Sequence, residues 1–521
     1  MFNHPDLSDR ELASRLPHTL GTQHPDNASP VPFGSSPRVD RQLEEEEVLY
    51  NVMTLGLPEV MIDYEKKQGG CTPLWDWLHR CPVCLEEKVI GRDFRVTPRV
   101  PNGDADRDDP YFWQAMGIFV HSLLVARRMG VEGMPFSEFI VPDAERGATV
   151  ARTEAHIAEL YRLQRTQYRQ YGDGSPFPYG GEFFAQGIPL IETVERLLDP
   201  APVWDALVAQ RKKLLGRDTY VQRSFIARSD PALKAGLLPA LLAAAVALAQ
   251  GREYERRTGV RIAQIVGIGS APFRGGLIPE PERLDAVLAT YPGMATVTLQ
   301  SAFRYDYPEG HVVAAARHLE TRLAEGWMAR HELSGAPGPA ELAALRQIAE
   351  RFRTAYEGSY REILPAVRRV AQEVPSRRDR YRNVALTGEV RRVGGLPAVR
   401  AIRFAASCYS LGLAPGVLGW RAWAGLDAPQ RRLVERICPT ARYWLREELR
   451  WLHPELPTRW PDAAARRALA EDAEAARAWA GAPEADGCHV EAVERVLRAL
   501  NAGEPLTPWI EEAARVRRFL G

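Results

Sequence analysis

Residues 221–230 read VQRSFIARSD, and residues 262–276 read IAQIVGIGSAPFRGG. Both stretches begin with a short run of apolar and β-branched residues, which is typical of a buried strand. Charged residues or glycines follow each run closely, and a long helical pattern separates the two runs. Strands that alternate with helices indicate a parallel sheet with crossover connections.

Similar short runs recur along the chain. They cover residues 94–97, 136–141, 188–191, 221–227, 262–268, 295–299 and 384–386. Helical patterns cover 341–356, 463–480 and 489–501, and Thr507 followed by Pro508 predicts the start of a last helix. We therefore expect an α/β fold of the (β/α)8 TIM-barrel type, with many additional α-helices and a helical C-terminal region.

The first forty residues have a different composition. They are rich in Pro, Asn, Ser and His and show neither helical nor strand periodicity. We expect residues 1–40 to form an N-terminal arm that carries the motif TQHPDN. Residues 41–521 are expected to form a single barrel-based catalytic domain with helical insertions and a helical C-terminal extension.

Charge and hydropathy limit the classes of partner. The 521-residue chain has 67 Lys and Arg and 67 Asp and Glu, so its formal net charge is zero. A neutral chain has no overall field to attract nucleic acid or an anionic membrane, and neither partner is expected. The polar N-terminus lacks the build of a signal peptide, and the longest apolar stretch, 235–250, is too short to span a membrane. It predicts a buried helix in a cytoplasmic protein.

The cysteines suggest no disulfide framework, because there are only six in so long a chain. Cys81 and Cys84 form a CxxC pair, with Cys71 and His79 nearby. This group could hold zinc, but the second CxxC of a zinc ribbon is missing. Ordinary reduced thiols are the preferred interpretation.

Polar side chains stand where the predicted strands end. Arg99, Glu192, Asp230, Arg274 and Gln300 each follow a strand-like run. The C-terminal ends of barrel strands converge on one face, where the active site lies. Two carboxylates with room for water suit Mg²⁺, and neighbouring arginines can bind phosphate or carboxylate groups.

Each of these signals also has a plainer structural interpretation. Glu192 could cap the helix that follows it, and Asp230 with the proline after it could start one. The RGG at 274–276 could be a phosphate-binding turn or an ordinary turn. His24 could be a turn residue. The run SRRDRYR at 376–382 could be a solvated loop or a nucleic-acid patch, and the zero net charge does not support the latter.

Several longer motifs occur in a fixed order. They read TQHPDN at 22–27, GRDFRVTPRVPN at 91–102, FIARSDPALKAG at 225–236, GIGSAPFRGG at 267–276, QSAFRYDYP at 300–308, SRRDR at 376–380 and LPAVRAI at 396–402. On these residues the chain, from about position 21 to its last residue, resembles the archaeal-type phosphoenolpyruvate carboxylases, relatives of the longer plant and bacterial enzymes.

The resemblance implies a cytoplasmic homotetramer that depends on Mg²⁺, for which Mn²⁺ can substitute. It would join phosphoenolpyruvate and bicarbonate irreversibly, through carboxyphosphate and enolpyruvate, to give oxaloacetate and phosphate, an anaplerotic step that supplies the tricarboxylic acid cycle. The implied catalytic residues are His24, Arg274, Arg400 and Lys234, and the implied metal ligands are Glu192 and Asp230. The implied substrate-binding residues are Arg99, Arg274, Gly275, Gly276, Gln300, Arg377, Arg378 and Arg400.

Two other functions stay open at the level of sequence. Another Mg²⁺-dependent barrel enzyme acting on phosphoenolpyruvate or pyruvate would keep the carboxylates and an arginine without needing the histidine motif. A catalytically silent relative could serve as a metabolite-binding or assembly subunit. The joint retention of His24, Glu192, Asp230, Arg274 and Arg400 argues against the silent relative.

Overall fold

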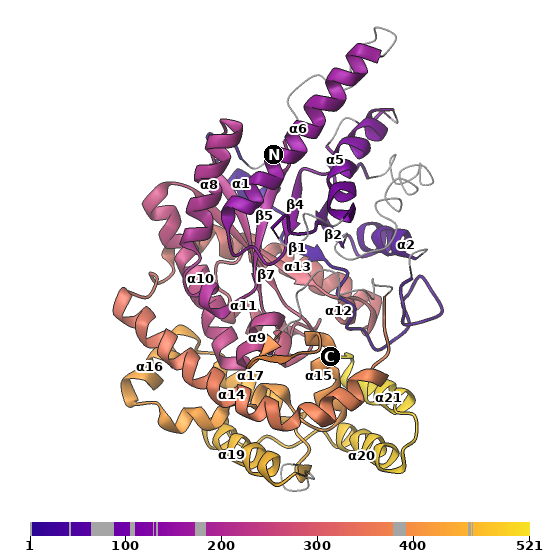
Figure 1. Ribbon diagram of the computed structural model, residues 1–521, viewed down its shortest axis with the longest axis vertical. Coiled ribbons are helices and arrows are strands. Elements are labelled where there is room, and N and C mark those ends of the chain that lie inside the picture. The colour runs from indigo at the N-terminus through magenta and orange to yellow at the C-terminus, as the bar shows by residue number, and fades with distance from the viewer. Residues whose placement is uncertain are drawn as a thin grey trace.

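A computed structural model describes residues 3–40, 43–63, 88–104, 110–128, 130–131, 134–171, 184–378, 392–456, 460 and 462–521. Within these ranges, eight parallel strands form a closed barrel, in which β1 pairs with both β2 and β8 (Figure 1). The strands are β1 Thr19–Gly21, β2 Glu59–Asp63, β3 Arg95–Arg99, β4 Glu138–Val141, β5 Gln186–Ile191, β6 Val221–Ala227, β7 Arg261–Gly267 and β8 Thr296–Leu299. The predicted (β/α)8 barrel is confirmed.

The predicted runs from 94–97 to 295–299 correspond to β3 through β8, within a few residues at each end. The run at 384–386 lies outside the described residues. Apolar side chains from different strands meet inside the barrel, where Leu20, Met61 and Ile140 belong to one buried cluster with Phe225 and Ile265. The barrel is therefore a packed core, and its chemistry must lie at an end of the strands.

The absence of regular structure expected for residues 1–40 is wrong. Ser8 caps helix α1 (Asp9–Arg15) through a capping box with Glu11, and strand β1 follows. All of β1 is buried, and it pairs with β8 along its whole length. The segment thus supplies a strand of the barrel and, directly after it, the TQHPDN motif.

Helices surround the barrel and extend it. Those that precede residue 338 are α1, α2 Glu44–Leu49, the π-helix η1 Tyr50–Thr54, α5 Pro110–Arg128, α6 Gly147–Tyr171, α7 Val194–Leu197, α8 Ala201–Leu215, α9 Ser229–Ala235, α10 Leu237–Thr258, the 3₁₀ helix η2 Pro272–Arg274, α11 Pro281–Thr290, α12 Ser301–Tyr305, α13 Glu309–Met328 and η3 Ala329–Glu332. The predicted apolar helix at 235–250 falls in α10, whose first three turns are almost entirely buried.

The C-terminal third is helical, as predicted. It comprises α14 Pro339–Glu373, a two-stranded ribbon of β9 Arg392–Val393 and β10 Leu396–Pro397, α15 Ala401–Ser410, η4 Pro415–Val417, η5 Trp420–Gly425, α16 Ala428–Ile437, α17 Ala441–Leu449, α19 Ala463–Ala480, α20 Gly487–Ala502 and α21 Thr507–Arg517. These helices gather in the lower part of Figure 1, at the end of the barrel where α9 lies. They therefore cover the end at which the strand-end residues are expected.

The described helices offer little that could span a membrane. Among them, no single helix is long and apolar enough to cross a membrane, and one pair bent by 98°, Ala401–Ser410 with Pro415–Gly425, passes the test in length and composition only.

Candidate active site

The predicted site residues occupy the C-terminal ends of the strands. His24 lies in the loop after β1, Arg99 ends β3, Glu192 follows β5, Asp230 lies in α9 after β6, Arg274 ends η2 after β7, and Gln300 follows β8. In a parallel barrel these positions share one face, so the predicted site residues lie at the same end of the fold.

His24 is half-buried, in a loop that is hydrogen-bonded to the start of α12. Its Nδ1 lies 3.0 Å from the Thr22 hydroxyl oxygen, which fixes the orientation of the ring. Its carbonyl oxygen accepts hydrogen bonds from the Ser301 hydroxyl at 2.5 Å and from the Ser301 amide at 3.3 Å. The loop is therefore tied to the β8 side of the barrel mouth.

Arg99 is held by a carboxylate that sequence reasoning missed. Its Nε and Nη2 donate to the two oxygens of Asp63 at 3.1 and 2.6 Å, and both side chains are at most 10% exposed. The Asp63 amide donates to the Gln23 side-chain oxygen at 2.9 Å, next to His24. This bidentate pair fixes Arg99 beside the His24 loop.

Arg274 is only 1% exposed and joins four strand-end segments. Its Nε donates to the Ser229 hydroxyl at 3.1 Å, and its Nη2 donates to the Gln300 side-chain oxygen at 2.5 Å. Its Nη1 donates to Asp26 at 3.0 Å and to the Gly521 carbonyl at 2.6 Å. Burial lowers the pKa of Arg274, and the negative charges of Asp26 and Asp230 oppose that shift.

The glycines after Arg274 have a local structural task. Gly275 and Gly276 have φ of 124° and 78°, a region that suits glycine. Their amides donate to the carbonyls of Pro272 and Ala271, each at 3.0 Å, within the turn. A Cβ on Gly276 would lie 2.2 Å from the Trp444 ring. Substrate binding by these two residues stays a prediction.

The two predicted metal ligands follow neighbouring strands, because β5 pairs with β6. Glu192 is 8% exposed, and its Oε2 accepts from the Asp143 amide at 2.8 Å. Helix α7 is capped by the Thr193 hydroxyl, and α9 is preceded by Arg228 without a side-chain cap. The capping interpretation of Glu192 is therefore wrong, whereas Asp230 and the proline after it do lie in the first turn of a helix, as the plainer interpretation has it. Two carboxylates at adjacent strand ends can offer hard oxygen ligands to a divalent cation.

Lys234 and Arg400 are placed by the helices α9 and α15. Lys234 lies in the last turn of α9, one turn beyond Asp230, and it is partly exposed. Arg400 is the N-cap residue of α15, and α15 packs against α9. Both predicted catalytic cations therefore lie on helices in contact with each other.

Arg377 and Arg378 are each 4% exposed, so the solvated-loop interpretation is wrong for them. Arg377 donates to the Asn27 carbonyl at 3.0 Å and to Glu511 at 2.9 Å. Arg378 donates to Glu47 on α2. They hold the His24 loop against α2 and α21, and their contact with substrate stays a prediction. Arg380 and Arg382 lie outside the described residues.

Glu47 is a second buried carboxylate that sequence reasoning missed. It accepts from the Gln23 amide group at 3.3 Å, from Arg304 at 3.3 Å and from the Tyr305 hydroxyl at 2.7 Å. Burial alone would raise the pKa of Glu47, but the guanidinium groups of Arg378 and Arg304 lower it to about 2. Glu47 is therefore an anion, and it anchors Gln23, the residue next to His24.

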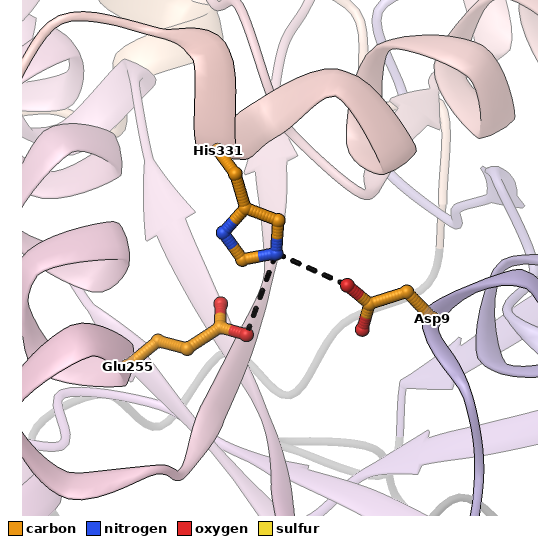
Figure 2. A group of neighbouring side chains, drawn as sticks. All are labelled: Asp9, Glu255 and His331. Carbon is orange, nitrogen blue, oxygen red and sulfur yellow. Dashed lines mark hydrogen bonds and ion pairs between the residues drawn. The ribbon is translucent and has the colours of Figure 1, made fainter.

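A separate cluster of His and carboxylates lies away from these strand ends. In Figure 2, His331 points toward Asp9 and Glu255, with its Nε2 at 3.0 Å from Asp9 and 3.9 Å from Glu255. The guanidinium of Arg330 already binds both carboxylates, at 3.1 and 2.7 Å. The cluster is therefore an ion-pair network that joins α1, α10 and η3.

The cysteine group at 71–84 lies outside the described residues. Within the described residues, Cys408 and Cys438 are buried free thiols and Cys488 is exposed. Burial raises the pKa of Cys438 to about 11, so this thiol stays protonated at neutral pH.

Comparison with known proteins gives a family match over almost the whole chain. A family model described as phosphoenolpyruvate carboxylase matches residues 16–521. The protein named phosphoenolpyruvate carboxylase in Methanothermobacter thermautotrophicus is 30% identical over 97% of this chain and 100% of its own. Proteins of the same name in Pyrococcus horikoshii and Leuconostoc mesenteroides are 33% and 30% identical, over 78% and 82% of this chain and 82% of their own chains.

Proposed function

Since this chain belongs to the phosphoenolpyruvate carboxylase family, we propose that it joins phosphoenolpyruvate and bicarbonate to give oxaloacetate and phosphate. The family and the named relatives make it a carboxy-lyase. The observation that carries the finer proposal is the convergence on Arg274, which contacts Asp26 in the His24 loop, Ser229 beside Asp230, and Gln300.

The proposed metal is Mg²⁺ held by Glu192 and Asp230, with Mn²⁺ as a substitute. The donor set fits, because Mg²⁺ in proteins takes one or two carboxylates and keeps positions for water and an anionic substrate. When bound, the ion would supply positive charge that stabilises anionic oxygens of the reacting groups. The Asp143 amide orients Glu192 through its bond to Oε2.

The arginines would bind and orient the anionic substrate. Arg99 is fixed by Asp63, and Arg400 begins a helix that packs on α9. Phosphoryl transfer depends chiefly on positioning and on stabilising charge spread over the phosphoryl oxygens. In the proposed reaction, a bicarbonate oxygen attacks phosphorus, the bond from phosphorus to the enol oxygen breaks, and carboxyphosphate and the pyruvate enolate result.

His24 would handle the proton in the second half of the reaction. The imidazole of His24, whose ring is oriented by the contact of Nδ1 with Thr22, is the proposed base that takes the carboxyl proton of carboxyphosphate. Loss of that proton breaks carboxyphosphate into carbon dioxide and phosphate, and the enolate carbon then bonds to carbon dioxide. Water must stay away from the enolate, because its protonation gives pyruvate instead.

The test follows oxaloacetate as NADH loss through added malate dehydrogenase. We expect turnover only when bicarbonate and Mg²⁺ are both supplied, and its loss with a chelator and recovery with Mg²⁺ or Mn²⁺. Glu192→Gln and Asp230→Asn should abolish Mg²⁺ binding measured by calorimetry, whereas the exposed pair partner Glu159→Gln on α6 should not change it. Turnover without bicarbonate would favour another barrel enzyme. Binding of phosphoenolpyruvate without any turnover would favour another barrel chemistry or a silent subunit.

We further propose that the enzyme works in the cytoplasm as a homotetramer and supplies oxaloacetate to the tricarboxylic acid cycle. This part of the proposal is supported by the resemblance in sequence. The mass of the assembly is the measurement that tests the oligomer.

A further inference from the structure

We propose that Asp26 is a positioning residue that sets the guanidinium of Arg274 in place for the reaction. The proposal deepens the proposed function and rests on the catalytic part assigned there to Arg274. Asp26 belongs to the TQHPDN motif, two residues after His24, and nothing in the sequence alone gave it a task.

Asp26 is fully buried, and each of its carboxylate oxygens serves a different strand end. Oδ1 accepts from the Ala302 amide at 2.8 Å and from the Ser301 hydroxyl at 3.2 Å, at the start of α12 after β8. Oδ2 accepts from Arg274 at 3.0 Å and from the Ser270 amide at 3.4 Å, in the turn after β7. One side chain thus joins the loops that follow β1, β7 and β8.

The donors of Arg274 are almost all committed. Of its five N–H groups, Nε is used by Ser229, both groups on Nη1 by Asp26 and Gly521, and one on Nη2 by Gln300. Among the residues that the structure describes, one group, on Nη2, has no acceptor. The direction of this remaining N–H is set by the partners that hold the rest of the guanidinium. Among them, the Asp26 carboxylate carries a negative charge.

Charge as well as shape makes a carboxylate necessary at position 26. Burial lowers the pKa of Arg274, and the adjacent charge of Asp26 counteracts that effect. An asparagine would offer one acceptor oxygen and one NH₂ group. With the oxygen on Ala302, the NH₂ group would face the donors of Arg274 and Ser270, so the guanidinium would have to move.

A neighbouring carboxylate provides a matched control. Asp306 accepts from the amides of Ala28 at 2.8 Å and Ser29 at 2.6 Å, so it holds the same loop from the other side. Asp306→Asn makes the same substitution at a half-buried carboxylate that binds loop amides instead of Arg274. A purely structural task for Asp26 would make the two variants behave alike.

The experiment is a double-mutant cycle on oxaloacetate formation with Asp26→Asn, Arg274→Lys and the two together. A misplaced catalytic group costs about 100-fold, so each single variant should lose on the order of 100-fold in kcat/KM. If Asp26 acts through Arg274, kcat/KM of the double variant should be no more than about 3-fold below that of the less active single variant. Asp306→Asn should lose less than about 5-fold. Multiplying losses, or equal losses in Asp26→Asn and Asp306→Asn, would overturn the proposal.

Two further arms keep the outcome readable. If Asp26→Asn does not fold, Asp26→Asn with Arg274→Met removes both charges, and recovered folding supports the pair whereas continued failure contradicts it. If the wild-type protein makes no oxaloacetate, the proposed function fails, and calorimetric binding of phosphoenolpyruvate decides about Asp26. Affinity reduced at least 10-fold in Asp26→Asn but not in Asp306→Asn would support the positioning task, and equal affinities would end it.

Discussion

At the scale of single residues, His24 has its ring fixed by Thr22 and its carbonyl fixed by Ser301. We predict that His24→Asn lowers the rate of oxaloacetate formation at least about 100-fold, because general acid–base catalysis contributes that much or more. Binding of phosphoenolpyruvate, measured by calorimetry, should persist. His318→Asn, at an exposed position on α13, is the control and should keep full activity. Normal turnover in His24→Asn would remove the proposed proton acceptor.

Gly276 offers a prediction about stability. Alanine there would have to adopt φ near 78° and place its Cβ 2.2 Å from the Trp444 ring. Strain and overpacking together should lower the free energy of unfolding by roughly 2–4 kcal/mol. Gly326→Ala in α13, where the described residues leave the Cβ position open, should instead raise it by up to about 1 kcal/mol. Denaturant unfolding of both variants checks the contrast in sign.

The search for polar residues directly after predicted strands identified five residues, because each follows a recognisable apolar run. They are Arg99, Glu192, Asp230, Arg274 and Gln300. The search missed Asp63 because the strand before it was not recognised, and Asp63 follows the same pattern once β2 is known. Asp26 and Glu47 could not be found this way. Their tasks depend on Arg274 and Arg378, which are more than two hundred residues further along the chain.

At the scale of elements, the barrel strands that sequence reasoning found are rich in Val, Ile and Phe, and the two barrel strands it missed have physical reasons to look unlike strands. β1 is three residues long and lies in a Pro-rich segment. β2 carries Glu59 and Asp63 at its ends, and their burial is tolerated only because Arg223 and Arg99 pair with them. A charged strand end whose partner lies on another strand cannot be recognised from local pattern.

Asp306, which binds two amides of the loop between β1 and α2, should make the stability of the protein depend on pH. Burial raises the pKa of Asp306 from 3.8 to about 7, although the Ala28 and Ser29 amides oppose the shift. A raised carboxyl pKa contributes stability that is fully present below pH 3.8 and is lost as the pH rises toward 7. Relative to Asp306→Asn, the wild-type free energy of unfolding should therefore fall by up to roughly 4 kcal/mol across this window.

Denaturant unfolding of the two proteins at several pH values between 4 and 8 measures this difference. The difference should level off above pH 7, since Asp306 is then ionised in both the folded and the unfolded chain. A difference that is constant with pH would mean that Asp306 keeps an ordinary pKa in the folded protein.

At the scale of the whole molecule, the C-terminal helices complete the candidate site. The Leu520 amide donates to the Asp26 carbonyl at 2.6 Å, and Arg377 donates to the Asn27 carbonyl at 3.0 Å. The sequence predicted a helical C-terminal region but not this task, because pairing between segments hundreds of residues apart leaves no local pattern. The barrel alone would therefore hold the His24 loop incompletely.

The proposed homotetramer can be tested directly by the mass of the assembly. We predict a particle of four times the 58.2-kDa chain mass in sedimentation equilibrium. The mass should not change with Mg²⁺ or phosphoenolpyruvate if the tetramer is constitutive. A single species with the mass of one chain would contradict the prediction and leave the enzyme complete in one subunit.

Closure of the barrel by β1 has a consequence for synthesis of the protein. Thr19 pairs with Val297, 278 positions later (297 minus 19), so the first strand has no partner on that side until β8 exists. At roughly 5–20 residues per second, a ribosome needs about 15–55 seconds to make the intervening chain. During that time, the nascent polypeptide exposes an unpaired strand edge and has no assembled histidine loop. The candidate site is completed later still, because Arg274 also binds the Gly521 carbonyl and the Leu520 amide binds the Asp26 carbonyl.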